Sequence, residues 1–385
     1  MSGSLRIEPF RVDTPDAALA DLRERLGRTR FPEQIPGAEW DYGTELGYLQ
    51  ELVAYWRDSY DWRKTEARLN ELDHHLTEID GARVHFVHAR SPEPDAFPVV
   101  MTHGWPGSFV EFEAILPLLT DPAAHGGDAA DAMDLVCPSI PGYAFSGPTH
   151  DRGWDTRRVA RAWAELMAGL GYDRYGAQGG DWGAMISTNL ALVDAEHCAG
   201  LHLNMPVGGP PPGADLSNPT PEEADALESM TTYGNDDSGY MKIQSTKPQT
   251  IGYLLDDSPA GLAAWIVEKF RTWSDCGGDV ERAFTRDQLI DNLMMYWLTA
   301  TGHSSARMYY ETTRSGNFGT SGVRVEVPTG CARFPREIIR PPRSWVEQSY
   351  NVVHWTDMPR GGHFAAMEQP ELLAADVREF FRGIR

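Results

Sequence analysis

The chain has 385 residues, of which 41% are hydrophobic and 23% charged, a balance that argues against disorder, collagen and coiled coil. Its 34 basic and 56 acidic side chains give a formal net charge of −22, which disfavours binding to nucleic acid or anionic lipid. The four cysteines form no C-x-x-C pair, and no apolar run reaches the roughly 18 to 20 residues of a membrane span. We therefore expect reduced thiols, no membrane anchor and a soluble, cytoplasmic protein.

The N-terminal region, residues 1–71, is expected to be helical. Leucines recur three and four residues apart within residues 15–26, and Thr14 is the expected N-cap. Residues 48–62 keep the same spacing and are rich in aromatic side chains. We interpret them as a buried helical face rather than a ligand site.

A β-hairpin is predicted next. Residues 76–79 and 84–87 alternate with period two on either side of Asp80-Gly81, which favours a type I′ turn. Four histidines crowd this hairpin: His74, His75, His85 and His88. No Asp, Glu or Cys lies at ligand spacing, so we predict no metal site.

The first part of an α/β core is predicted over residues 72–206. Short apolar runs alternate there with helical patterns such as residues 110–119 and 158–170. Such alternation indicates parallel strands joined by right-handed crossovers, in a doubly wound sheet. The apolar runs are residues 97–102, 134–137, 175–177 and 200–205.

A helical insertion is predicted over residues 207–318, which begin with a Gly- and Pro-rich stretch and continue with helical patterns. A helical block inserted into a parallel sheet is typical of a cap over an active site. Strand patterns at residues 323–327 and 351–355 and a final helix at 370–384 then return to the core, so residues 319–385 complete it.

Chemistry is indicated by the segment Gly179-Gly180-Asp181-Trp182-Gly183, between a strand pattern and an apolar helix pattern. Small residues around a central nucleophile form the strand–turn–helix elbow of hydrolases. Here the usual serine is Asp181, whose carboxylate suits displacement at a saturated carbon and leaves an alkyl ester. Water that hydrolyses this ester needs a general base and an oxyanion hole.

Further features favour this role over a merely structural carboxylate. The segment His103-Gly104-Trp105-Pro106-Gly107 follows a strand where hydrolases place an oxyanion-hole donor. We assign the hole to the backbone N–H groups of Trp105 and Trp182.

The general base is expected after the last strand, where His363 stands in a Gly-rich segment. The order nucleophile, acid, base is that of α/β-hydrolases. Glu337 is the favoured acid, but spacing alone does not choose between it and three others: Glu326, Glu347 and Asp357.

The chain resembles the microsomal-type epoxide hydrolases, an α/β-hydrolase family, over nearly its whole length. The shared motifs are HGWPG (103–107), PGYAFS (141–146), GGDWG (179–183), SGYMKIQ (238–244), KP (247–248), RMYYE (307–311), VPTG (327–330) and RGGHFAA (360–366). The resemblance implies that residues 1–71 wrap the core and cap. It also implies a cis Trp105–Pro106 bond. Ala144 departs from the family, where glycine is common at this position.

The resemblance implies an enzyme that adds water to an epoxide and releases a vicinal diol, without cofactor or metal. Asp181 would be the nucleophile, His363 the base and Glu337 the charge-relay acid. Tyr240 and Tyr309 would be the paired cap tyrosines that hydrogen-bond the ring oxygen, with Tyr310 as the obvious alternative to Tyr309. Phenols with a pKa near 10 stay protonated at neutral pH and suit this task.

The expected partner is a small-molecule epoxide, bulky and apolar, and bacterial relatives suggest secondary-metabolite and antibiotic biosynthesis such as that of enediyne cores. Mammalian members begin with a membrane anchor that is absent here, in line with a soluble enzyme. Assembly into a homo-oligomer stays open. Two alternatives remain: a haloalkane dehalogenase, which shares the Asp nucleophile, and a non-catalytic ligand-binding homologue of the fold.

Overall fold

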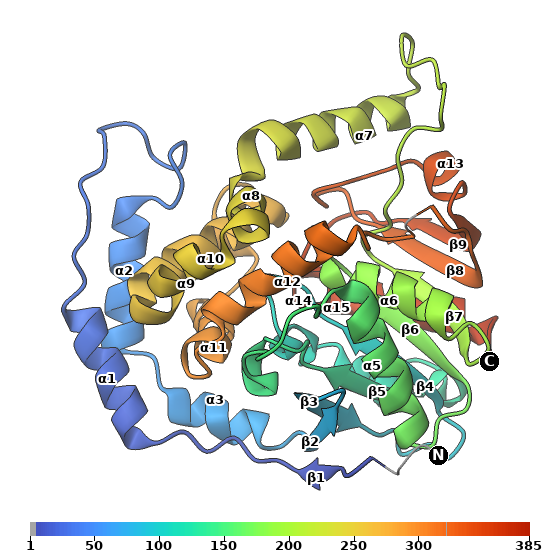
Figure 1. Ribbon diagram of the computed structural model, residues 1–385, viewed down its shortest axis with the longest axis horizontal. Helices are drawn as coiled ribbons and strands as arrows, with labels where there is room; N and C mark the ends of the chain where they lie inside the picture. Colours follow the sequence, from blue (N-terminus) through green and yellow to red (C-terminus); the bar gives the residue numbers. More distant parts are fainter. Residues whose placement is uncertain (1–4, 321) are drawn as a thin grey trace.

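The computed structural model describes residues 5–320 and 322–385, which fold around one sheet (Figure 1). The nine strands of this described part lie in the order β1-β2-β3-β5-β4-β6-β7-β8-β9. Pairs up to β3–β5 are antiparallel, and every pair from β5 to β9 is parallel. The strands are β1 (Glu8–Pro9), β2 (His74–Ile79), β3 (Ala82–Ala89), β4 (Phe97–Thr102), β5 (Met133–Pro138), β6 (Tyr175–Gly179), β7 (Cys198–Leu203), β8 (Val325–Arg333) and β9 (Tyr350–Asp357).

Each predicted strand overlaps an observed one, because an apolar run this short is better suited to a buried strand than to a helix. The β2–β3 hairpin turns at Asp80 and Gly81, whose φ angles of 49° and 77° suit the predicted type I′ turn. Strand β1 is two residues long, and the sequence showed no strand pattern there.

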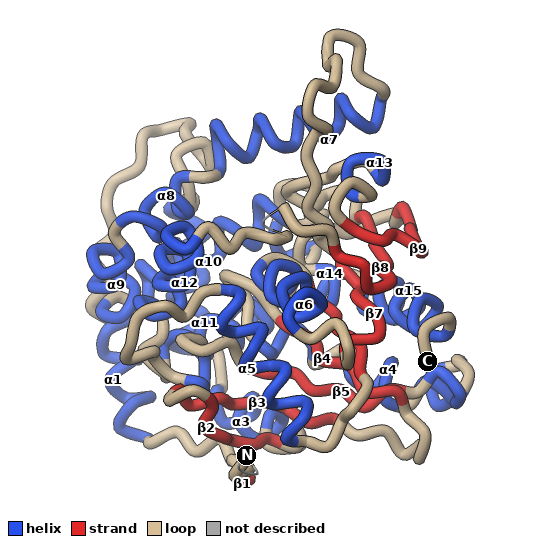
Figure 2. Tube along the Cα trace, turned by 45° about the vertical axis from the view of Figure 1, so that its right-hand side comes forward, coloured by secondary structure: helices blue, strands red, loops and turns tan. Residues whose placement is uncertain are grey.

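Helices cover both faces of the sheet, with α5 (Thr156–Gly169) and α6 (Trp182–Val193) on one face and α4 (Leu116–Thr120) and α15 (Pro370–Arg382) on the other (Figure 2). The predicted helix over residues 110–119 is wrong. It is a 3-10 turn, η1 (Phe109–Phe112), followed by α4, because Pro117 fits only the first turn of a new helix.

The N-terminal helices are α1 (Asp16–Gly27), α2 (Leu46–Asp58) and α3 (Trp62–Leu69). Thr14 is not the N-cap of α1. Its backbone N–H donates to Glu66 Oε1 at 2.7 Å, and Pro15 occupies the N-cap position. The single helix expected around residues 48–62 is divided between α2 and α3, because Asp61 caps a new helix with its side chain.

The segment between β7 and β8 forms a layer of helices above the carboxyl ends of the parallel strands (Figure 1). It contains α7 (Pro221–Thr232), a π-helical turn η5 (Tyr233–Asp237), α8 (Gly239–Thr246), α9 (Pro248–Asp257), α10 (Pro259–Trp273), α11 (Arg286–Trp297) and α12 (Gly302–Ser315). Two short helices follow, α13 (Arg343–Val346) and α14 (Ala365–Glu368).

Polar contacts join the N-terminal helices to this layer. Tyr60 Oη donates to Asp291 Oδ1 at 2.6 Å, and the Arg68 guanidinium lies 2.6 Å from Asp291 Oδ2. The Asp291 side chain is buried, so these two partners satisfy a carboxylate that would otherwise be costly to bury. Among the described helices, none has the length and apolar character needed to cross a bilayer.

Candidate active site

Asp181 lies at a sharp turn between β6 and α6, with φ 51° and ψ −128°. An L residue in this left-handed region is strained, and such strain is common at functional positions. The flanking glycines are required by space: a Cβ at position 183 would lie 1.8 Å from the Thr102 carbonyl oxygen, and one at 179 would lie 2.3 Å from the Gly183 carbonyl carbon. Strand and helix therefore approach closely enough to raise Asp181 above the sheet edge.

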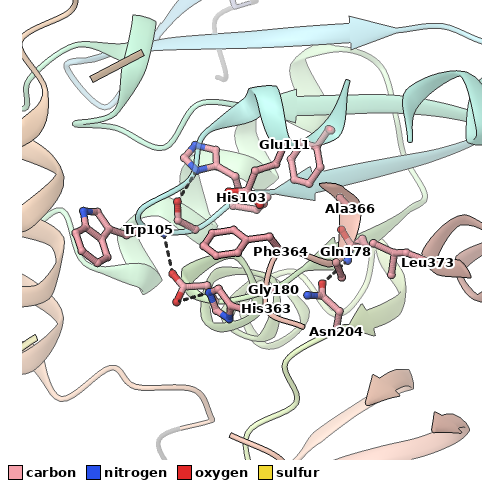
Figure 3. Close-up of a pocket in the computed structure, with 15 residues that line it drawn as sticks. His103, Trp105, Glu111, Gln178, Gly180, Asn204, His363, Phe364, Ala366 and Leu373 are labelled. Carbon is pink, nitrogen blue, oxygen red and sulfur yellow. Dashed lines mark hydrogen bonds and ion pairs between the residues drawn. The ribbon is translucent and has the colours of Figure 1, made fainter. Parts of the chain in front are cut away.

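The Asp181 carboxylate contacts two of the predicted site residues, Trp105 and His363, which are labelled in Figure 3. The Trp105 N–H donates to Asp181 Oδ1 at 2.8 Å, and His363 Nε2 lies 3.5 Å from Asp181 Oδ2. The Trp105–Pro106 bond is cis, as expected. Trp182 is the first residue of α6, so its N–H has no acceptor within the helix. Within the described residues this N–H makes no hydrogen bond to the Asp181 carboxylate.

The His103–Gly107 loop is held from inside the core by its own histidine. His103 Nε2 accepts from the Ile140 N–H at 3.2 Å, so Nδ1 carries the proton and donates to the Gly104 carbonyl at 3.0 Å. Burial lowers the pKa of His103 to about 4, which keeps the ring neutral. Gly104 must be glycine, since a Cβ there would lie 2.3 Å from Asp181 Cβ.

Helix α11 holds the same loop from the other side. Asn292 Nδ2 donates to the Pro106 carbonyl at 2.7 Å, and Tyr296 Oη donates to the Gly107 carbonyl at 2.5 Å. Both side chains are buried. The inserted helices therefore fix the loop that presents the Trp105 N–H to Asp181.

Glu337 is the carboxylate that meets His363, with Oε1 2.6 Å from Nδ1. Only 1% of Glu337 is exposed. The three alternative acids lie elsewhere: Glu347 pairs with Arg343, Asp357 pairs with Arg333, and Glu326 is exposed on β8. Although burial lowers the pKa of His363, the charges and hydrogen bonds of Glu337 and Asp181 raise it well above its ordinary value.

Two tyrosines from the helical layer face the aromatic side chains beside Asp181. Tyr240 on α8 stacks on Trp105 with ring centroids 4.7 Å apart, and Tyr309 on α12 meets Trp182 edge-on at 4.6 Å. Both tyrosines are buried, and burial raises the pKa of each well above its ordinary value, so the phenols stay protonated. Tyr310 is half-buried and lies under the Arg314 guanidinium instead.

Tyr233 was missed in the sequence. Its hydroxyl lies 2.8 Å from that of Tyr240. It precedes Tyr240 by seven residues, a spacing that places two side chains on one helical face, and this spacing was the available signal. The contact makes a second phenol a direct partner of one cap tyrosine.

Two hollows lie near these residues. A groove of about 1080 Å³ is lined by residues 40–44 and by α7, α8 and α10, and its lining includes Tyr240, Trp273 and Glu337. A separate cavity of about 20 Å³ lies against Asp181 and His363 (Figure 3). The stacked rings of Trp105 and Tyr240 lie between the two, because Trp105 lines the cavity and Tyr240 lines the groove.

Three of the four hairpin histidines make hydrogen bonds with neighbouring side chains. His74 Nδ1 lies 2.9 Å from His85 Nε2, and His88 Nε2 lies 2.8 Å from Tyr172 Oη. In the part of the chain that the structure describes, no three His, Cys, Asp or Glu side chains gather as metal ligands would.

Comparison with known proteins identifies the family. The pattern described as "Epoxide hydrolase N terminus" matches residues 7–112, and that of the alpha/beta hydrolase fold matches residues 98–251. Epoxide hydrolase 1 of Sus scrofa is 41% identical over 401 residues, covering 97% of this chain and 88% of its own length. The chain belongs to the epoxide hydrolase family.

Two further relatives extend the match. A protein of Stigmatella aurantiaca (strain DW4/3-1), whose name assigns it provisionally to the epoxide hydrolases, is 50% identical and covers 98% of this chain and 86% of its own. The crystal structure of juvenile hormone epoxide hydrolase from the silkworm Bombyx mori superimposes with a TM-score of 0.92 at 34% identity, covering 99% of this chain and 95% of that one. This epoxide hydrolase thus has the α/β-hydrolase fold expected from its sequence.

Proposed function

We propose that this epoxide hydrolase opens its substrate through an ester on Asp181. Asp181 Oδ2 attacks a ring carbon, the bond between that carbon and the ring oxygen breaks, and the oxygen takes a proton from Tyr240 or Tyr309. A carboxylate is suited to this displacement at saturated carbon, and a protonated phenol is suited to the developing alkoxide. The product of this step is an alkyl ester of Asp181.

Water then hydrolyses the ester. His363 Nε2 takes a proton from water while the water oxygen bonds to Asp181 Cγ, and the negative charge moves to Oδ1, which the Trp105 N–H already contacts. We assign the second donor to the Trp182 N–H. The Cγ–Oδ2 bond breaks, and the diol leaves with Oδ2 and a proton from His363. The new carboxylic acid of Asp181 loses its proton, and the phenolate regains one.

The charge on His363 supports this order of events. In the free enzyme burial lowers the pKa of His363, but the charges of Glu337 and Asp181 raise it and favour the protonated form, which cannot act as a base. Ester formation removes the negative charge of Asp181, and the pKa of His363 falls as a result. The base therefore becomes competent once the ester that it must hydrolyse has formed.

The substrate class that we propose is an uncharged, apolar epoxide. Aromatic rings surround the position between Asp181 and the phenols: Trp105, Trp182, Tyr240, Trp273 and Tyr309. Apolar side chains of this kind favour apolar ligands, and the net charge of −22 disfavours anionic ones.

The observation that carries the proposal is the line of contacts from Glu337 through His363 to Asp181, with two buried phenols opposite. The test uses an aryl-substituted epoxide, with diol measured by chromatography and the protein mass measured during turnover. Asp181→Ala abolishes diol formation, and His363→Gln accumulates enzyme heavier by one epoxide. Glu347→Gln, at a surface carboxylate, is the control and retains activity. Diol from Asp181→Ala, or chloride release from haloalkanes in place of diol, contradicts the proposal.

A further inference from the structure

The small cavity beside Asp181 is polar and has the volume of one water molecule. Its volume of about 20 Å³ exceeds the roughly 10 to 15 Å³ that a cavity needs in order to hold one water molecule. Besides Asp181 and His363, its lining includes Glu111, Gln178 and Asn204. In Figure 3, Gln178 and Asn204 lie on the opposite side of this cavity from Trp105.

Gln178 and Asn204 leave a hydrogen-bonding group without a protein partner. Gln178 Nε2 donates to Asn204 Oδ1 at 2.9 Å, and the two residues are 1% and 5% exposed. Gln178 Oε1 is buried and has no hydrogen-bond partner among the described residues. A buried acceptor without a partner destabilises the protein, and a bound water usually supplies the missing hydrogen bond.

Glu111 is a half-buried carboxyl that has no role in the steps proposed for Asp181, His363 and Glu337. It lies in η1, directly after the Trp105 loop, and a Cβ at Gly107 would lie 1.2 Å from its Oε1. The loop glycine therefore makes room for this carboxyl. Burial and the charge of Asp181 raise the pKa of Glu111 to about 8, against the opposing charge of His363. At neutral pH it is mostly protonated and can donate a hydrogen bond.

The epoxide does not fit this cavity. The ring oxygen must reach Tyr240 or Tyr309, and neither tyrosine lines the cavity. The volume is also too small for any substituted epoxide. Trp105 lines the cavity and stacks on Tyr240, so the cavity contacts Asp181 and His363 apart from the two phenols.

We propose that Gln178, Asn204 and Glu111 bind the water that hydrolyses the Asp181 ester. The proposal rests on the proposed function. The water donates to Gln178 Oε1 and accepts from Glu111. Its oxygen bonds to Asp181 Cγ and one of its protons passes to His363 Nε2. The Cγ–Oδ2 bond then breaks, and the diol leaves with Oδ2 and the proton that His363 returns. The three residues are positioning residues, because they act on the water and not on the epoxide.

The test separates ester formation from ester hydrolysis. An aryl epoxide is mixed rapidly with the enzyme, and tryptophan fluorescence and quenched-sample mass spectrometry follow the ester. Gln178→Met keeps the size of the side chain and removes its amide. We expect ester formation within twofold of the parent rate and hydrolysis at least tenfold slower, so that ester accumulates.

A second pair of variants keeps the proposal testable if Gln178→Met fails to fold. Glu111→Leu removes the donor and slows hydrolysis in the same selective way, whereas Glu111→Gln retains a donor and restores most of the rate. Asn189→Leu removes a buried amide of α6 outside the cavity and leaves the ratio of the two rates unchanged.

Two results overturn the proposal: hydrolysis at the parent rate in Gln178→Met and Glu111→Leu, or an equal slowing of both steps in these variants. The proposed function has a separate test. If His363→Gln accumulates no ester, the covalent route itself is wrong, whatever the cavity variants do.

Discussion

His363 Nδ1 lies 2.6 Å from Glu337 Oε1, so a buried carboxylate orients the histidine that we propose as the base and favours its charged form. On its other side, Nε2 lies 3.5 Å from Asp181 Oδ2. Burial lowers the pKa of His363, but these two carboxylates raise it well above 6.5. The protonation state of the base therefore depends on whether Asp181 carries a charge.

The rate of ester hydrolysis is expected to depend on pH with an apparent pKa. This apparent pKa should be lower than the pKa of His363 in the free enzyme. Below its pKa His363 is protonated and cannot accept a proton, so hydrolysis is slow; the rate rises with pH and levels off above that pKa. The ester has removed the Asp181 charge, which lowers the pKa. NMR titration of the free enzyme and stopped-flow hydrolysis rates give the two values. A kinetic pKa equal to or above the NMR value contradicts this expectation.

The two adjacent tyrosines of α12 are expected to differ sharply. Tyr309→Phe removes a buried phenol beside Trp182, and ester formation slows on the order of 10²-fold, as for loss of a positioned general acid. Tyr310→Phe is the matched control with little effect, because its ring lies under Arg314. Single-turnover measurements of the rate of ester formation compare the two variants. Equal effects of the two substitutions would contradict the assignment of Tyr309.

Tyr233→Phe tests the phenol pair. Its hydroxyl contacts that of Tyr240 at 2.8 Å, and loss of one hydrogen bond costs about 0.5 to 1.5 kcal/mol. We expect ester formation to slow roughly 2- to 10-fold, with hydrolysis of the ester unchanged. An unchanged rate of ester formation would show that this contact does not orient Tyr240.

Ala144 is predicted to lower the free energy of unfolding relative to glycine at the same position. It is buried in the loop after β5 with φ 41°, a left-handed conformation that strains residues with a Cβ. Ala144→Gly should raise the free energy of unfolding by about 0.5 to 1 kcal/mol, after the entropy of glycine in the unfolded chain is subtracted. Ala132→Gly, at φ −60°, is the control and should lower it. Urea unfolding measures both, and a loss of stability in Ala144→Gly would contradict the strain.

Much of the fold could be predicted because the spacing of apolar residues, and the residues that begin or end helices and strands, are local properties of the chain. The runs that became β4 to β7 are short, apolar and flanked by helical patterns, so their assignment did not depend on distant residues. Boundaries were less predictable. Pro117 breaks one expected helix and Asp61 begins another, and both effects depend on a single residue within an otherwise continuous pattern.

The site was predictable only in part. Asp181 is marked by its glycines, and the resemblance supplied Glu337, Tyr240 and Tyr309. Gln178 lies only three residues before Asp181, but its position within an apolar strand gives no sign that its amide borders the site. Glu111 is 70 residues from Asp181 in the chain, and packing between the two segments brings it to the same cavity. Contacts of this kind lie in the tertiary structure and leave no periodic signal in the sequence.

The covalent route is tested most directly by a single turnover in water enriched in ¹⁸O, with enzyme in excess over an aryl epoxide. If Asp181 Oδ2 forms the new bond to carbon, the first diol carries no label, and one ¹⁸O enters the peptide that contains Asp181. Mass spectrometry of the diol and of the proteolysed enzyme reads both results. A labelled first diol with an unlabelled Asp181 would show that water attacks the epoxide directly, and the account would be wrong.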